Sequence, residues 1–184
     1  KSYRRGIEIE GSCLLTQKLR WSANLTLSKN KLDTITQFID NWDTGIQEAV
    51  THENTDLAFS PNIIWSSQLS YAINNNTSMN FVSKYVGKQY IDNTSSNDRQ
   101  LDDYLISNLQ IDYKLKSTIF NTAKISILIN NIFDNEYVSS AWLYRFISEG
   151  FDPRDSDHYV TKDSDSRYNM AGYFPQATRN YLVG

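Results

Sequence analysis

The residues whose types could support chemistry are few and lie far apart along the 184-residue chain. Glu8 and Glu10 are two positions apart, so on a strand they share one face, as the paired acids of a glycosidase can. Arg4 would lie on that face too, and we favour ordinary polar-face charges over a catalytic pair. Cys13 is the only cysteine. It cannot form an internal disulfide, and we interpret it as a small packed or lipid-facing residue rather than a nucleophile.

Two histidines and two acidic clusters are the only candidates for metal binding. His52 and His158 lie in different expected loops, and two ligands do not make a zinc site, so we expect both to be solvated. The carboxylates at 155–157 and 163–165 could bind Ca²⁺, but their spacing is not that of an EF-hand, and we favour a solvated acidic loop. No phosphate loop, nucleophile elbow or cysteine–histidine pair is present. The sequence therefore predicts no metal, no cofactor and no enzyme.

Aromatic and basic residues form a third group of candidates, in or near three long polar segments. Aromatic rings stack on planar ligands and Arg pairs with carboxylates or catecholates, so such residues suit an anionic small molecule. The candidate ligand-binding residues are Trp42, Arg99, Tyr144 and Arg145. Other aromatic residues near strand ends are interpreted as a belt at a membrane interface. These are Trp21, Tyr90, Tyr113 and Trp142, of which Trp21 and Tyr113 are expected to face lipid.

Alternation of apolar and polar residues with period two dominates the elements that must position these side chains. From Leu19 to Ser28 the alternation is unbroken, which predicts a strand with one apolar and one polar face. Related patterns predict seven strands, at residues 3–13, 19–28, 62–71, 78–90, 104–115, 122–132 and 171–184. Ordinary strands average about 5–6 residues, whereas a bilayer requires about 9–11, and several of these segments have that length.

The connections between these strands alternate in length. Short connections at 15–18, 73–77 and 116–121 alternate with long ones at 31–59, 91–100 and 138–170. Outer-membrane barrels have short turns at one end and long loops at the other. The sequence thus predicts an all-β fold, an antiparallel meander of about seven long strands that is part of a large transmembrane β-barrel. The alternative is a soluble or surface β-sandwich that binds carbohydrate or protein, in which the apolar faces of the strands would pack on each other.

Charge and hydropathy exclude two other classes of protein. The chain has 18 basic and 21 acidic residues, a net charge of −3, so no strongly basic face and no nucleic-acid partner is predicted. Spanning helices need about 18 or more consecutive apolar residues, and the sequence contains no such run.

Six short motifs resemble the TonB-dependent outer-membrane receptors and occur in the order of that family. They lie at residues 2–11 (SYRRGIEIEG), 19–24 (LRWSAN), 60–62 (SPN), 83–90 (SKYVGKQY), 130–137 (NNIFDNEY) and 174–181 (FPQATRNY). The last two are similar to the penultimate-strand signature and the start of the closing strand of the family. Thr178 departs from the common Gly, and residues 1–184 stop at Gly184, a few residues before the terminal aromatic residue on which the closing strand of the family usually ends.

The resemblance implies a barrel of about 22 strands with a plugged lumen. Residues 1–184 would supply its C-terminal part, the last seven strands, with the plug and the earlier strands absent. The implied function is import of a scarce nutrient across the bacterial outer membrane, with a ferric siderophore or a similar iron complex as the expected ligand. The implied partners are outer-membrane lipid, the small-molecule nutrient and, through the absent plug, the TonB complex.

Overall fold

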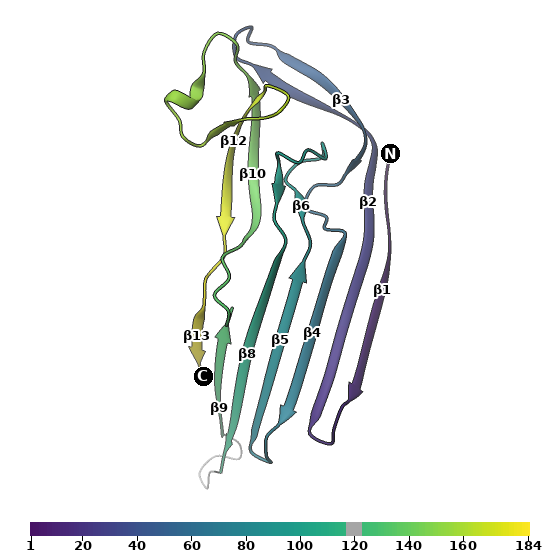
Figure 1. Cartoon of the computed structure of the whole chain (residues 1–184), viewed down its shortest axis with the longest axis vertical. Helices are drawn as coiled ribbons and strands as arrows, with labels where there is room; N and C mark the ends of the chain where they lie inside the picture. The colour runs from purple at the N-terminus through teal and green to yellow at the C-terminus, as the bar shows by residue number, and fades with distance from the viewer. Residues whose placement is uncertain (117–122) are drawn as a thin grey trace.

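The computed structural model describes residues 1–116 and 123–184, and Figure 1 shows their arrangement. Within these residues the strands form one eleven-stranded sheet and one two-stranded sheet. The large sheet contains β1 (Ser2–Leu14), β2 (Leu19–Asn41), β3 (Gln47–Asp56), β4 (Ile63–Ala72), β5 (Thr77–Val86), β8 (Tyr104–Leu115), β9 (Ala123–Asn130), β10 (Val138–Ile147), β11 (Val160–Lys162), β12 (Tyr168–Pro175) and β13 (Asn180–Val183). The small sheet pairs β6 (Gln89–Tyr90) with β7 (Gln100–Leu101), and a 3₁₀ helix, η1, spans Pro153–Asp155.

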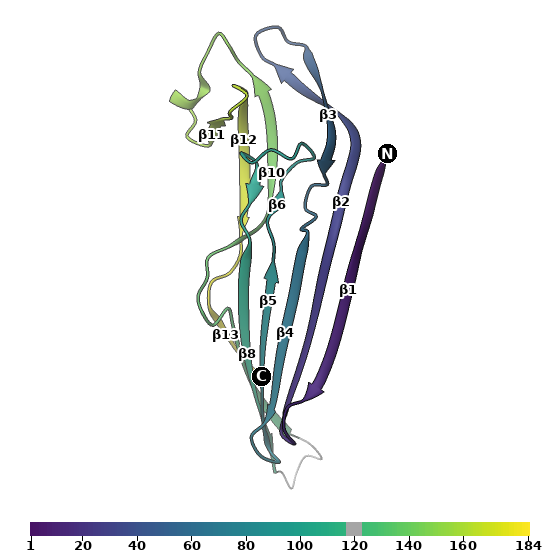
Figure 2. The same ribbon diagram turned by 45° about the vertical axis from the view of Figure 1, so that its right-hand side comes forward.

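The lower part of the large sheet is an antiparallel meander that we call the wall. It consists of β1, residues 19–30 of β2, and β4, β5, β8, β9 and β13, each paired antiparallel with the next. Short turns join the strands at the lower end in Figure 1, and the sheet curls as it crosses from β1 to β13 (Figure 2). The antiparallel meander predicted from alternation is confirmed, and β8 has the predicted bounds.

Side-chain hydrogen bonds stabilise two of the short turns predicted from the sequence, those at 15–18 and 73–77. Thr16 Oγ1 accepts hydrogen bonds from the backbone N–H groups of Lys18 and Leu19 at 3.2 and 3.0 Å. Asn74 Oδ1 accepts from Asn76 and Thr77, both at 2.9 Å. Such side chains replace a backbone acceptor and favour a tight turn. The turn predicted at 116–121 lies almost wholly outside the described residues.

The apolar side chains of the wall form continuous rows across its strands. One row runs through all seven strands by directly opposed pairs: Cys13, Trp21, Leu69, Phe81, Leu109, Ile129 and Tyr181. Many of these side chains remain exposed, Trp21 to 41% for example. A sandwich would bury the apolar face against a second sheet, whereas a barrel leaves it as one continuous outward band. In the described residues the apolar face of the wall is such a band.

The prediction of a loop at 31–59 is wrong. β2 continues to Asn41 and β3 returns along it, with Lys31 opposite Asp56 and Asp40 opposite Gln47. Residues 31–41 lack a clean alternation because one side contains both Ile39, which is fully buried, and charged groups. At the tip, Asn41 Oδ1 accepts from the backbone of Asp43 at 3.0 Å, and Gly45 has φ +72°, a conformation that glycine adopts without strain.

The prediction of a loop at 138–170 and of one closing strand at 171–184 is also wrong. β10 occupies the start of that loop, and the closing strand is divided into β12 and β13. The break lies level with the motif at 130–137, where Asn131 and Asp134 have positive φ values of 50° and 59°. Asn131 N donates to Asn108 Oδ1 at 2.9 Å, and Asn135 Nδ2 donates to Leu105 O at 2.7 Å. These side-chain bonds replace the β ladder at the break.

The other strand ends differ by a few residues. β5 ends at Val86 rather than at 90, although Gly87 N still donates to Ile63 O at 2.9 Å, and residues 89–90 form the separate strand β6. β9 ends at Asn130, two residues before the predicted end. None of the described residues lies in a helix long and apolar enough to cross a membrane.

Candidate functional site

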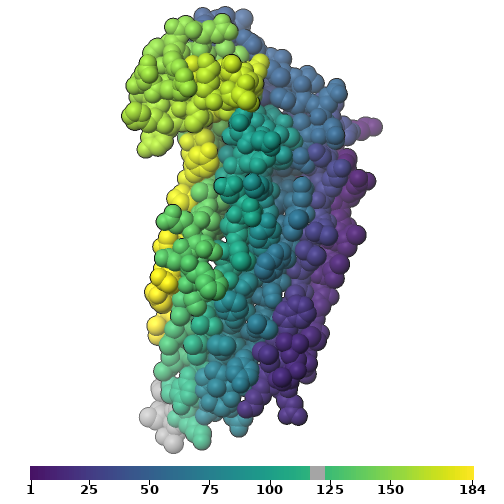
Figure 3. Space-filling view, in the orientation of Figure 1, coloured from purple at the N-terminus to yellow at the C-terminus, as the bar shows by residue number. Residues whose placement is uncertain are grey.

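Three long connections meet above the wall and form a compact body that we call the loop cap. It comprises residues 31–57, 87–103 and 139–167. Phe146 and Ile147 of β10 pair in parallel with Asp40 and Asn41 of β2. The first and third connections are therefore joined by backbone pairing. Figure 3 shows the third connection overhanging the end of the sheet. The confirmed placement of all long connections at one end makes this cap the candidate site.

Buried apolar side chains give the cap two small cores. Ile91 and Leu101 of the second connection pack with Ala141 on one face of β10. Phe146 packs with Val160 and Tyr168 on the other face. Because β10 has buried apolar residues on both of its faces, it lacks a regular apolar–polar alternation, and a period-two pattern could not reveal it.

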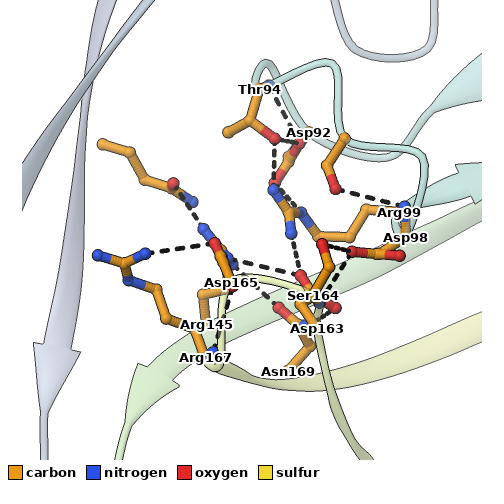
Figure 4. A network of polar contacts seen from close by, with 12 residues as sticks. Asp92, Thr94, Asp98, Arg99, Arg145, Asp163, Ser164, Asp165, Arg167 and Asn169 are labelled. Carbon is orange, nitrogen blue, oxygen red and sulfur yellow. Dashed lines mark hydrogen bonds and ion pairs between the residues drawn. The ribbon is translucent and has the colours of Figure 1, made fainter.

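Arg99 lies at the centre of the polar contacts drawn in Figure 4. Its Nε donates to Asp92 Oδ2 at 2.8 Å, and its Nη2 donates to Thr94 Oγ1 at 2.6 Å. Its Nη1 forms an ion pair with Asp163 of the third connection. Only 4% of the side chain is exposed. Arg99 therefore joins the second connection to the third, and its donors are directed at protein groups.

Arg145 of β10 makes the corresponding contacts to the first and third connections. Its Nε donates to Asn169 Oδ1 at 3.1 Å, and its Nη1 donates to Gln37 Oε1 at 3.1 Å. Its Nη2 forms ion pairs with Asp165 and, at 3.5 Å, with Asp163. Like Arg99, it is almost fully buried. The two arginines predicted to meet a ligand are thus engaged within the cap.

Asp163 accepts hydrogen bonds from three residues, Arg99, Arg145 and Asn169. Burial raises the pKa of Asp163, while the guanidinium groups of Arg99 and Arg145 act in the opposite direction. A carboxylate between two buried guanidinium groups compensates their charge. The interpretation of 163–165 as a solvated acidic loop is therefore wrong for Asp163, whose side chain is 4% exposed.

Further contacts tie the three connections together at the rim of the network. Ser164 donates to Asp98 Oδ2 through its backbone N–H at 3.1 Å and its hydroxyl at 2.7 Å, and the latter bond holds the pKa of Asp98 below its usual value. Asp43 accepts from the backbone N–H groups of Glu149 and Gly150 at 2.6 and 3.1 Å. These bonds link all three connections into one body.

Trp42 and Tyr144, the other two candidate residues, lie together in an aromatic cluster. Trp42 stacks on the buried Phe146, with ring centroids 3.9 Å apart and ring planes at 11°. Trp42 Nε1 donates to the Tyr144 hydroxyl at 3.2 Å, which donates to Asp40 Oδ2 at 2.7 Å. This last bond lowers the pKa of Asp40 and raises that of Tyr144. Trp42 remains 48% exposed, so it offers a fixed stacking surface.

Two cavities adjoin these candidates. One of about 450 Å³ is lined by Tyr144 and Arg145 together with Asp92 and Phe38. A second, of about 350 Å³, is lined by Trp42 and Tyr144 together with Asp40 and Gln47. Tyr144 borders both. The structure thus brings Trp42 and Tyr144 together at accessible surface, and Arg99 and Arg145 together beneath it.

The residues predicted for a membrane-interface belt fall into two groups. Trp21 and Tyr113 lie in the apolar rows of the wall, exposed to 41% and 45%. Tyr90 lies in β6, within the loop cap, and is half-buried. Trp142 lies on β10 against Gly172, and it is 47% exposed.

Charge divides the chain between the cap and the remainder. The cap has 16 acidic and 7 basic residues, a net charge of −9, and the remaining residues have 5 acidic and 11 basic, a net charge of +6.

His52 is partly buried and its Nε2 lies 3.2 Å from Gln37 Oε1, so the prediction that it is solvated holds only in part. Within the described ranges, the acidic, histidine and cysteine side chains form no group of three that could hold a metal ion.

Sequence reasoning missed several residues that build the cap, because their partners are distant in sequence. Asp163 is 64 residues from Arg99, and Gln37 is 108 residues from Arg145. Asp40 is 104 residues from Tyr144. The surplus of carboxylates over arginines within the long connections was the one available signal of internal pairing.

No protein-family model and no curated protein matches the sequence. Solved structures do match the fold. The siderophore receptor PiuA from Acinetobacter baumannii matches with a TM-score of 0.66 at 14% identity, over 99% of this chain and 21% of its own. The ferric-catecholate import receptor Fiu from E. coli K12, in its closed form, matches with 0.61 at 16% identity, over 99% and 20%. The ferric yersiniabactin uptake receptor FyuA from Yersinia pestis matches with 0.51 at 12% identity, over 100% and 24%.

The chain therefore spans about a fifth of the length of the siderophore receptor PiuA. At these identities the likeness establishes the fold, a segment of the barrel found in such receptors. The fold expected from the sequence motifs is confirmed.

Proposed function

We propose, starting from the fold shared with these receptors, that residues 1–184 form the C-terminal part of the barrel of a TonB-dependent receptor in the bacterial outer membrane. The receptor imports a scarce nutrient, a ferric siderophore or a similar iron complex. The observation that supports this most is the row of directly opposed apolar residues through all seven strands of the wall. A face of this kind suits lipid, and the loop cap at one end suits ligand capture.

The dimensions of the apolar face agree with this proposal. On β8 this face runs from Leu105 to Leu115, with Ser107 as its one polar residue. Ten steps of about 3.3 Å give about 33 Å along the strand, or about 25 Å across a membrane for a tilt of roughly 35–45°. The lipid-facing band of outer-membrane barrels is about 25 Å tall. The polar side chains of the wall, on its other face, would then line the lumen.

The alternative function, a soluble or surface sandwich that binds carbohydrate or protein, requires a second layer over the apolar face. The described residues place the wall in a single sheet, with large apolar side chains such as Ile125 and Ile127 exposed to 42% and 40%. The likeness to transport receptors weighs against catalysis as well, and we assign no reaction to the chain.

Within the cap, we assign direct ligand contact to Trp42 and Tyr144. Trp42 is exposed and held by Phe146 and by Tyr144, so a planar ligand group could stack on it at little entropic cost. Arg99 and Arg145 act as positioning residues, because their guanidinium groups bind Asp92, Asp163 and Asp165 within the cap. An anionic complex would then need cations other than Arg99 and Arg145.

The transport step follows the family to which the motifs are similar. External loops capture the ligand, and a plug absent from residues 1–184 rearranges when the TonB complex engages it. The contribution of this chain is the wall that holds the plug and the cap that meets the ligand.

The test is ligand binding by the full-length receptor purified in detergent. Replacing Trp42 by Ala should weaken binding of the ferric complex that supports growth under iron limitation by about tenfold, since a stacking contact contributes about 0.5–1.5 kcal/mol beyond its buried area. Tyr159, 77% exposed in the third connection and outside the lining of both cavities, provides the control, and Tyr159→Ala should bind normally. Recovery of the full-length protein as a soluble monomer without detergent would refute the proposed function.

A further inference from the structure

Two basic residues stand directly opposite each other on neighbouring strands. Arg5 of β1 and Lys29 of β2 are register partners, and both are exposed. In the part of the chain that the structure describes, neither has a carboxylate within ion-pair distance. Like charges directly opposite each other destabilise an antiparallel pair, since their Cβ atoms are about 4.5–5.5 Å apart. Such a pair calls for an anion between its members.

The pair lies at the edge of the apolar band, on the same face. The last apolar row on these strands is Ile7 opposite Leu27, and Arg5 opposite Lys29 is the next row on that face. Two residues advance about 7 Å along a strand, or about 5 Å across a tilted sheet. A bilayer has about 30 Å of hydrocarbon and about 40–45 Å in all, so its headgroup layer is about 5–8 Å deep. The two cations therefore fall at headgroup depth, at the end of the wall that carries the loop cap.

The backbones of β1 and β2 approach closely beside the pair, since a Cβ at Gly6 would lie 2.6 Å from Leu27 O. The Arg5 guanidinium carbon lies 5.3 Å from the centre of the Tyr3 ring, a cation–π contact that restricts the side chain.

A third basic residue nearby, Lys31, is already paired with a carboxylate and adds no unpaired charge. Lys31, in the following row, binds Asp56 at 2.9 Å and is neutralised there. The local excess is thus two positive charges, contributed by one guanidinium and one ammonium group. Arg binds phosphate through two parallel N–H bonds and Lys binds it as a point charge.

We propose that Arg5 and Lys29 are a docking site for a phosphate group of a phosphorylated glycolipid in the outer leaflet. A phosphate monoester has a charge of about −1.5 to −2 at neutral pH, which matches the pair. The inference rests on the proposed function, because it requires the apolar face to lie in the bilayer. In this site the lipid relieves the repulsion between β1 and β2, so it stabilises the wall as well as binding to it.

The experiment uses the full-length receptor, delipidated in detergent and titrated with bis-phosphorylated lipid A by native mass spectrometry. The double variant Arg5→Gln/Lys29→Gln should bind lipid A at least about tenfold more weakly than the unaltered receptor. The matched control is Arg20→Gln/Lys84→Gln, which removes the same two charges from the polar face of β2 and β5 and should bind normally. Dephosphorylated lipid A should bind weakly to every variant, and millimolar inorganic phosphate should not compete.

Equal binding by the double variant, or equal loss in the control, would overturn the inference, as would full competition by inorganic phosphate, which would indicate an ion site. A second variant guards against misfolding. Lys29→Glu should form a cross-strand ion pair with Arg5, so it should lose lipid A binding while its Tm in detergent is unchanged or higher. Retained binding in Lys29→Glu would also refute the site.

The two proposals fail in different ways. Membrane insertion of the unaltered receptor, measured by fractionation and detergent dependence, tests the proposed function alone. A receptor that inserts normally but shows no preference for phosphorylated lipid would remove only the docking site.

Discussion

The wall and the loop cap of this chain are built on opposite principles. The wall is a repeated backbone ladder in which each strand pairs with its neighbour and apolar rows run straight across. The cap also contains backbone pairing, in the β2–β3 hairpin and between β2 and β10, but its three connections are joined mainly by side chains, around Arg99, Arg145 and Asp163. The residues outside the cap, which include the wall, have a net charge of +6, and the cap has a net charge of −9. The difference teaches that the same chain can specify one region by local pattern and another by distant pairing.

The strongest test of this comparison is removal of the carboxylate at the centre of the cap. Asp163→Ala leaves the guanidinium groups of Arg99 and Arg145 buried without their shared partner. Breaking a buried ion pair in this way costs about 3–5 kcal/mol. We expect the loss to appear as faster hydrogen exchange throughout the cap, with the exchange of β4 and β5 unchanged. Exchange that accelerates equally in the wall would show that the two regions are one cooperative unit.

Asp155 provides the control for that change, because it is exposed in η1. Asp155→Ala should leave cap exchange unchanged.

A charge in the centre of the apolar band tests the wall instead. Leu109 lies in the row that crosses all seven strands, opposite Phe81 and Ile129. Leu109→Arg should lower the free energy of unfolding in lipid by about 2–4 kcal/mol, the cost of Arg near the midplane of a barrel. The matched change in the cap, Phe38→Arg, should cost little because Phe38 is 64% exposed. Equal costs in urea titrations of the refolded receptor would contradict the assignment of the face to lipid.

Two glycines of β1 test how closely β1 packs against β2, because only one of them lies against the neighbouring backbone. A Cβ at Gly6 would lie 2.6 Å from Leu27 O, whereas a Cβ at Gly11 would meet nothing within 4 Å. Gly6→Ala should therefore destabilise the wall by about 1–3 kcal/mol through overpacking, and Gly11→Ala should be neutral or slightly stabilising. Heat denaturation in detergent measures both. A smaller effect at Gly6 than at Gly11 would show that β1 does not pack on β2 as described.

The smallest expected effect is a pH dependence confined to the cap. Burial and the charge of Arg145 lower the pKa of His52 from 6.5, with Arg99 and Arg167 acting in the same sense and Asp92 opposing. The unfolded chain therefore binds a proton more readily, so cap stability is full above pH 6.5 and declines as the pH falls below it. Hydrogen exchange of the cap at pH 7.5 and 5.5, corrected for intrinsic rates, should show this decline.

His52→Gln should remove the decline between these two pH values, while His158→Gln, at an exposed position, should not alter it. A decline that persists in His52→Gln would assign it to another group.

The wall could be predicted from sequence because its rule is local. β8 alternates from Tyr104 to Leu115 and was placed at these bounds. β10 could not be placed, because Ala141 and Phe146 are buried on opposite faces and the apolar–polar alternation disappears. The end of β9 was misplaced because Asn131 leaves the ladder through a positive φ, which no alternation encodes.

The candidate site was predicted in part. The aromatic and basic residues of the long connections were found by composition, and the contact between Trp42 and Tyr144 agrees with their joint selection. The burial of Arg99 and Arg145 could not be foreseen, since it depends on Asp163, which is 64 residues from Arg99. Whether Trp42 and Tyr144 contact a ligand remains a prediction.

The break between β9 and β10, matched by the break between β12 and β13, bears on how such a chain can evolve. Below the break, β9 pairs with β13, from Asn130 opposite Asn180 to Ile127 opposite Val183. Above it, β10 pairs with β12, from Val138 opposite Pro175 to Phe146 opposite Tyr168. An inserted or deleted residue in an unbroken strand would reverse the face of every residue beyond it. An irregular joint absorbs that change. The cap can thus gain or lose residues over generations while the lipid-facing rows keep their alignment.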